Sequence, residues 1–130
     1  MIEFHLETRS GIPTYLQLVQ QVRQGVRLGV LRPGDQLPTV KEVVEKLTIN
    51  PNTVLRAYRE LDLEGLVEGR RGVGTFITSK RAPVPPSDVK TLRSSLERWI
   101  ERARAAGLDD ENMSALFADT LRPPTISRVA

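Results

Sequence analysis

Cysteine is absent from this 130-residue sequence, and histidine occurs once, as His5. Without cysteine the chain has no disulfide framework, no thiolate zinc site and no cysteine nucleophile. An enzyme would need a nucleophile, a base and an orienting group, or a metal triad, and the remaining residues show no such constellation. We therefore expect no metal site, no cofactor and no enzymatic activity.

Long hydrophobic runs and aromatic residues are also scarce. No stretch approaches the roughly 20 apolar residues of a membrane span, and the first 25 residues have no hydrophobic core of a signal peptide. The chain has three Phe, two Tyr and one Trp. We expect a soluble, cytoplasmic protein without a membrane partner, built as one ordinary domain or as a small domain with an appendage.

An excess of one charge is found only in the first part of the chain. The formal net charge is +3; residues 1–81 hold 12 Lys and Arg against 9 Asp and Glu, whereas residues 82–130 hold 7 against 7. The amino-terminal part is thus the part suited to an anionic partner, although many solvated surfaces are equally basic.

Two helices are predicted before residue 50. The first runs from Pro13 to about Gly29, and its apolar residues keep helical spacing along one face. Pro33-Gly34 breaks the chain before a short extended piece over 35–38. Thr39 with Glu42 forms a capping box that begins the second helix. The apolar stripes consist of Leu16, Val19, Val22, Val26 and Val30 in the first helix and Val40, Val43, Val44 and Leu47 in the second.

A third helix and a hairpin follow. Asn50 is a preferred N-cap, Pro51 suits the first helical position, and Gly65 ends the helix. Its inward stripe is Val54, Ala57, Tyr58 and Leu61. Short strands over 66–68 and 75–77 flank a turn at 71–74. This order predicts a winged helix-turn-helix over 11–79, a fold that is mainly α with a small β-hairpin wing.

The outward face of the third helix is polar. Asn52, Thr53, Arg56 and Arg59 lie away from the inward stripe. Asn can pair with adenine, Arg with guanine, and Thr can contact phosphate or a thymine methyl group. On this helix alone, a solvated surface explains the same residues equally well.

Cations on neighbouring elements favour DNA binding over a solvated surface. Arg70 and Arg71 precede Gly72, where the backbone can approach a phosphate closely, and Lys41 adds a cation near the start of the second helix. In a winged helix these elements flank one groove of DNA. The predicted DNA-binding residues are Thr39, Lys41, Asn50, Asn52, Thr53, Arg56, Arg59, Arg70, Arg71 and Gly72.

Several motifs occur together and in order, namely Pro13 to Tyr15, Leu31 to Pro38, Ile49 to Val54, Arg56 to Tyr58, Leu61 to Val67 and Gly72 to Phe76. On these motifs, residues 11–79 resemble the DNA-binding domain of the GntR transcriptional regulators, and the stretch around Asn50 resembles the YtrA branch. The resemblance implies DNA contacts from Lys41, Asn52, Thr53 and Gly72. Lys41 stands where an arginine is usual. Asn50-Pro51 replaces the usual Ser-Arg or Thr-Arg, so no contact is carried over to position 51.

A proline-rich linker is expected over 80–87, followed by a helical segment over 88–122 and a tail over 123–130. The first helix of this segment has apolar residues at heptad spacing as far as Ala106, Gly107 ends it, and a shorter helix follows. The apolar face either packs onto the chain's own winged helix or pairs two chains. The resemblance implies a short dimerisation segment, whose predicted residues are Val89, Leu92, Leu96, Trp99, Ile100, Ala103, Leu116 and Phe117.

Together these features predict a sequence-specific DNA-binding regulator, a repressor that binds a two-fold symmetric operator as a homodimer. The resemblance implies control of a neighbouring ABC-transporter operon and of the protein's own gene. The alternative is a winged-helix protein-interaction module without specific DNA binding. The sequence leaves open whether a small-molecule effector takes part.

Overall fold

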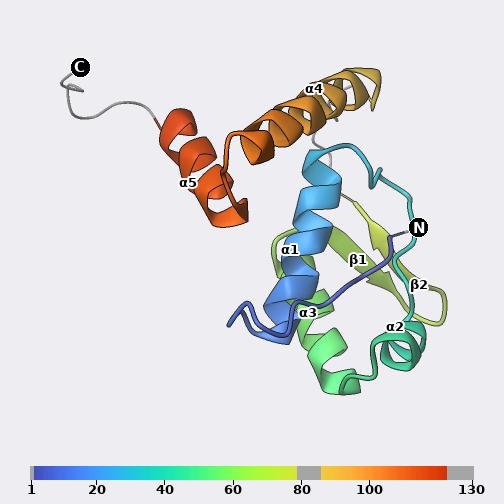
Figure 1. Ribbon diagram of the computed structural model, residues 1–130. Helices are drawn as coiled ribbons and strands as arrows, with labels where there is room; N and C mark the ends of the chain where they lie inside the picture. Colours follow the sequence, from blue (N-terminus) through green and yellow to red (C-terminus); the bar gives the residue numbers. More distant parts are fainter. Residues whose placement is uncertain (1, 79–85, 123–130) are drawn as a thin grey trace. The chain divides into compact units, whose positions relative to one another are not determined.

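The computed structural model describes residues 2–78 and 86–122 (Figure 1). The chain divides into two compact units, one up to Pro86 and one from Ser87 onward, and each is described by itself. Most of the expected linker, over 80–85, and the expected tail over 123–130 lie outside the described residues. The predicted mainly α fold with a hairpin wing is confirmed: the first unit holds three helices and one hairpin.

Helix α1 (Thr14–Arg27) packs against α3 (Pro51–Leu63) through a fully buried apolar face that includes Leu18, Val19 and Val22. The placement of Val30 on this face was wrong, because the helix ends at Arg27 and leaves Val30 63% exposed. Leu31 is buried instead and packs over Gly25, where a Cβ would lie 2.8 Å from Leu31 Cδ1.

The predicted caps of α2 (Val40–Leu47) and α3 are confirmed. Thr39 Oγ1 accepts a hydrogen bond from the Glu42 amide, and Glu42 Oε1 accepts one from the Thr39 amide, both at 3.1 Å. Asn50 Oδ1 accepts a hydrogen bond from the Asn52 amide at 2.8 Å. Thr48 takes the left-handed conformation (φ 54°), so the chain turns sharply between the two helices (Figure 1).

Strands β1 (Val67–Arg70) and β2 (Gly74–Ile77) form an antiparallel hairpin in which Val67 lies opposite Ile77 and Arg70 opposite Gly74. The extended piece before α2 pairs with the outer edge of β2. The Leu37 amide donates to the Thr75 carbonyl, and the Ile77 amide donates to the Asp35 carbonyl, each at 2.8 Å. The hairpin is thereby attached to the segment that leads into α2.

The segment before α1 belongs to the first unit, although the sequence placed the start of the domain at residue 11. Phe4 is only 6% exposed and packs into the hydrophobic core. The buried Gln17 side chain forms hydrogen bonds with the backbone of Glu7, accepting at 2.8 Å and donating at 3.1 Å. Gln21 pairs with the backbone of His5 in the same way.

The second unit is a pair of helices, α4 (Pro86–Ala105) and α5 (Asp110–Leu121). The last two residues of the expected linker, Pro86 and Ser87, form the first turn of α4, where proline costs no hydrogen bond. Ala103 of α4 and Met113 of α5 are buried. Among the described residues, no helix is long and apolar enough to cross a membrane.

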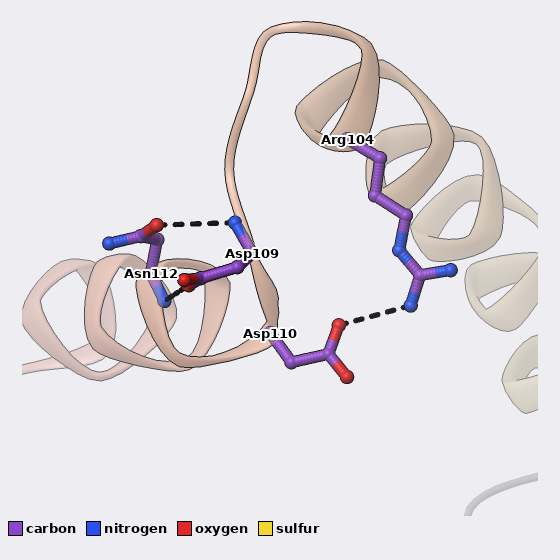
Figure 2. A network of polar contacts seen from close by, with 4 residues as sticks. All are labelled: Arg104, Asp109, Asp110 and Asn112. Carbon is purple, nitrogen blue, oxygen red and sulfur yellow. Dashed lines mark hydrogen bonds and ion pairs between the residues drawn. The ribbon is translucent and has the colours of Figure 1, made fainter.

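Polar contacts hold the turn between α4 and α5 (Figure 2). Asp109 caps α5: its Oδ1 accepts a hydrogen bond from the Asn112 amide at 2.7 Å, and Asn112 Oδ1 accepts one from the Asp109 amide at 3.1 Å. Arg104 and Asp110 form an ion pair of 3.1 Å across the turn. Large apolar side chains are exposed on both helices, namely Leu92, Leu96, Leu116, Phe117 and Leu121.

Candidate nucleic-acid interface

The outward face of α3 lies where the sequence placed it. Asn52, Arg56 and Arg59 are exposed, and Thr53 is half-buried. The opposite face holds the helix in the core through Val54, Ala57, Tyr58 and Leu61. The Tyr58 hydroxyl donates to the Pro38 carbonyl at 2.6 Å, and burial raises the pKa of Tyr58. The position of α3 is therefore fixed while its polar face remains open.

Two predicted contact residues, Thr39 and Asn50, also act as N-caps. Each uses a side-chain oxygen to accept an amide hydrogen of its helix. Their side chains are fixed by this bond, which restricts what they can offer to a ligand. Lys41, in the first turn of α2, is exposed and makes no ion pair or hydrogen bond with its side chain within residues 2–78 and 86–122.

The wing differs in its two arginines. Arg70 lies over the Phe76 ring, 4.3 Å from its centroid, and its Nε is 3.0 Å from Glu68 Oε1. Arg71 is exposed and has no ion pair in the described part of the chain. Gly72 has φ +75°, the left-handed region that favours glycine. Thr39 and residues 69–75 line one shallow hollow, which brings the start of α2 beside the wing.

Sequence reasoning missed Gln36, which supports the wing from the segment before α2. Its Nε2 donates to the Val73 carbonyl at 3.2 Å. The same amide occupies the space beside Gly74, where an added Cβ would overlap it. An isolated polar residue in an extended segment gives no pattern by which this contact could be predicted.

Tyr15 was also missed as a neighbour of the outward face of α3. Arg56 Cζ lies 3.7 Å from the centroid of the Tyr15 ring, close enough for a cation–π contact. Tyr15 stands in a motif that the sequence analysis singled out, but its contact depends on how α1 packs against α3.

An ion pair fastens α1 to the end of α3, near Gly65. Arg23 Nε lies 3.0 Å from Glu64 Oε2, and the two side chains also pair through Arg23 Nη2 and Glu64 Oε1. The hydrogen bond from Arg23 lowers the pKa of Glu64.

No three His, Cys, Asp or Glu side chains in the described ranges are placed to hold a metal ion. The outward face of α3 and the wing therefore offer hydrogen-bond donors and positive charge rather than a metal site.

Known proteins similar to this chain are transcriptional regulators. The profile described as "Bacterial regulatory proteins, gntR family" matches residues 14–77. The chain is 35% identical to the HTH-type transcriptional repressor YtrA of Bacillus subtilis (strain 168) over 109 residues, which cover 83% of this chain and 84% of that protein. The chain belongs to the GntR family. The predicted resemblance to the YtrA branch is likewise confirmed, and these names describe transcriptional regulators rather than enzymes.

Solved structures share the fold of this GntR-family chain. A transcriptional regulator from Oenococcus oeni is 35% identical, with a TM-score of 0.52 over 90% of this chain and 98% of its own. The DNA-binding domain of AraR, solved in complex with operator ORE1, is 23% identical, with a TM-score of 0.50 over 60% of this chain and 95% of its own. The AraR similarity shows a shared winged-helix fold.

The structure places the two groups of predicted residues in separate units. All ten predicted DNA-binding residues lie on α2, α3, their caps or the wing. The eight predicted dimerisation residues lie on α4 and α5: Ala103 is buried, Val89, Trp99 and Ile100 are half-buried, and Leu92, Leu96, Leu116 and Phe117 are exposed. Their roles in binding remain predictions.

Proposed function

We propose that this GntR-family chain is a transcriptional repressor that binds a two-fold symmetric DNA operator as a homodimer. The observation that carries the proposal is the open polar face of α3 in the same compact unit as Arg71, an exposed wing cation without an ion pair within the described ranges. A helix of this kind enters the major groove, and a wing beside it grips the flanking backbone.

The side chains divide into two roles. Asn52, Arg56 and Arg59 face the base edges, where Asn recognises adenine and Arg recognises guanine. Lys41 and Arg71 contact phosphates, which position the protein and carry no sequence information. Thr39, Asn50, Thr53 and Gly72 border the backbone, and Arg70 supports the wing through Phe76 and Glu68.

Dimerisation occurs through α4 and α5. Their large exposed apolar side chains would be removed from water by a second chain, at about 25 cal/mol per Å² of apolar surface. A dimer presents two recognition helices, and its two-fold symmetry favours an inverted-repeat operator. The regulator acts on the chromosome in the cytoplasm. By its YtrA resemblance it represses a neighbouring ABC-transporter operon and its own gene.

In vitro selection from a randomised duplex library tests this function. The full chain should enrich an inverted repeat, and a promoter carrying that repeat should be repressed in a reporter strain. A variant with Asn52→Ala and Arg59→Ala is the matched control and should not enrich the repeat. It should still fold, because both side chains are exposed and lie off the core. Failure of the native chain to enrich any sequence would favour the alternative, a protein-interaction module.

A further inference from the structure

We propose that Tyr15 helps to set the DNA sequence preference of the protein, by holding the Arg56 guanidinium in position to read a guanine. The inference rests on the function proposed above. Tyr15 is the second residue of α1, and Arg56 lies in the second turn of α3. A residue of the scaffold helix would thereby act on the recognition helix as a positioning residue.

The geometry of the pair is that of a stack. Arg56 Cζ lies 3.7 Å from the centroid of the Tyr15 ring. The ring is itself held, because Tyr15 is half-buried and packs against the hydrophobic core. The guanidinium therefore rests on a surface that is fixed by the packing of α1.

Stacking leaves the hydrogen-bonding edge of Arg56 free. The ring occupies one face of the guanidinium, whereas its N–H groups point outward in the guanidinium plane. Within residues 2–78 and 86–122, the Arg56 side chain makes no hydrogen bond or ion pair. Arg70 provides a contrast within the same unit: it also stacks, on Phe76, but its Nε is bonded to Glu68.

A stacked guanidinium with a free edge is suited to a base. Guanine presents O6 and N7 side by side in the major groove, and arginine binds both in a planar, bidentate contact. A free arginine loses side-chain rotamer freedom when it forms that contact, whereas one already stacked on a ring loses less. Phosphate oxygens also accept hydrogen bonds from the guanidinium edge, and the experiment separates the two ligands.

The experiment measures binding to the duplex selected by the native chain and to copies with each base pair changed in turn. The Arg56→Ala variant identifies the guanine that Arg56 reads. Replacing that base pair weakens binding of the native chain but should not weaken binding of the variant. Tyr15→Leu, which removes the aromatic face, should reduce the preference for that guanine by about 2- to 5-fold, the usual strength of an exposed cation–π contact. Tyr15→Phe keeps the face and should keep the preference.

Combining the changes separates positioning from a structural role. In the Arg56→Ala background, Tyr15→Leu should have no further effect on base preference at any position. Thermal unfolding of each variant identifies losses caused by misfolding, and Tyr15→Phe retains the packing of the ring. An undiminished guanine preference in Tyr15→Leu would overturn the inference. An equal loss of affinity for every sequence in Arg56→Ala would also overturn it, because that result would assign Arg56 to a phosphate. Failure of the native chain to select any duplex would instead overturn the proposed function.

Discussion

At the scale of single residues, arginines of identical charge have different partners. Arg23 is paired with Glu64, Arg70 with Glu68 and Phe76, and Arg56 with the Tyr15 ring, whereas Arg71 has no ion pair in the described ranges. The sequence identified Arg56, Arg70 and Arg71 together as candidate DNA contacts. Only the packing of their neighbours shows which of them retain a free hydrogen-bonding edge.

Arg71→Ala should reduce the salt dependence of DNA affinity by about 0.9 in the log–log slope, since one phosphate contact is lost. Its affinity for selected and random duplexes should fall alike. The matched control combines Glu68→Gln with Arg70→Gln, which removes the wing ion pair without changing the net charge. Salt titration by fluorescence anisotropy measures the slopes. A control that loses as much slope as Arg71→Ala would show that Arg70 contacts phosphate.

Glu64→Gln should reduce stability at neutral pH by about 0.2–1 kcal/mol, the usual contribution of an exposed ion pair. Arg23 holds the pKa of Glu64 below its ordinary value of 4.5 in the folded chain. The stabilisation is therefore present above about pH 4.5 and is lost as pH falls through the folded-state pKa. Urea unfolding from pH 7 to 3 should show a shallower decline in the variant than in the native chain.

Glu45→Gln is the control for the pH series, because Glu45 is exposed and has no ion pair among the described residues. It should unfold with the pH dependence of the native chain. Equal pH profiles for Glu64→Gln and the native chain would show that the pair with Arg23 contributes no net stability.

At the scale of helices and strands, local sequence signals predicted most of the first unit. The capping residues Thr39, Glu42 and Asn50 and the apolar stripes predicted α2 and α3 because these signals act within a few residues along the chain. Burial of Phe4 and exposure of Val30 could not be predicted in this way. The first depends on contacts distant in sequence, and the second on where α1 stops.

The candidate site was predictable to a similar extent. Spacing on α3 placed Asn52, Arg56 and Arg59 on one face, as the structure shows. The supporting contacts of Gln36 with the wing and of Tyr15 with Arg56 join elements that are distant in the chain. Neither has a local signature, so only the folded chain reveals them.

Gly74→Ala should disrupt the wing, because Gly74 has φ +144° and an added Cβ would overlap the Gln36 amide. Strain of this kind costs about 1–3 kcal/mol, and DNA affinity should fall with it. Gly69→Ala is the matched control, since Gly69 lies in β1 with open space beside it. Thermal unfolding and DNA titration on the same samples check both effects. Equal behaviour of the two variants would show that the backbone conformation of Gly74 does not constrain the wing.

At the scale of the whole molecule, the two compact units carry different kinds of surface. The first presents a polar, cationic face on α3 and the wing, and the second presents large apolar side chains on α4 and α5. The first surface suits an anionic polymer and the second suits another protein surface. Each chain would therefore bind DNA through one unit and its partner through the other.

Replacing Trp99 and Ile100 together with Ser and Asn should yield monomers whose DNA affinity falls sharply, because the two recognition helices are no longer linked. Sedimentation velocity measures the association, and circular dichroism checks that the helices persist. Ser94→Asn with Glu101→Gln is the control, because both positions are exposed and lie off the apolar stripe. Dimers of unchanged affinity in the Trp99 and Ile100 variant would place the interface elsewhere.

The most direct test of the proposal that this chain is a homodimeric repressor is a stoichiometric titration on the selected duplex. Fluorescence anisotropy reads the titration at concentrations well above the dissociation constant. Saturation should occur at two chains per duplex carrying the full inverted repeat. A duplex with one half-site scrambled should bind much more weakly, because both recognition helices must be engaged for full affinity. Saturation at one chain per duplex, with equal affinity for the full and the scrambled sites, would contradict the account.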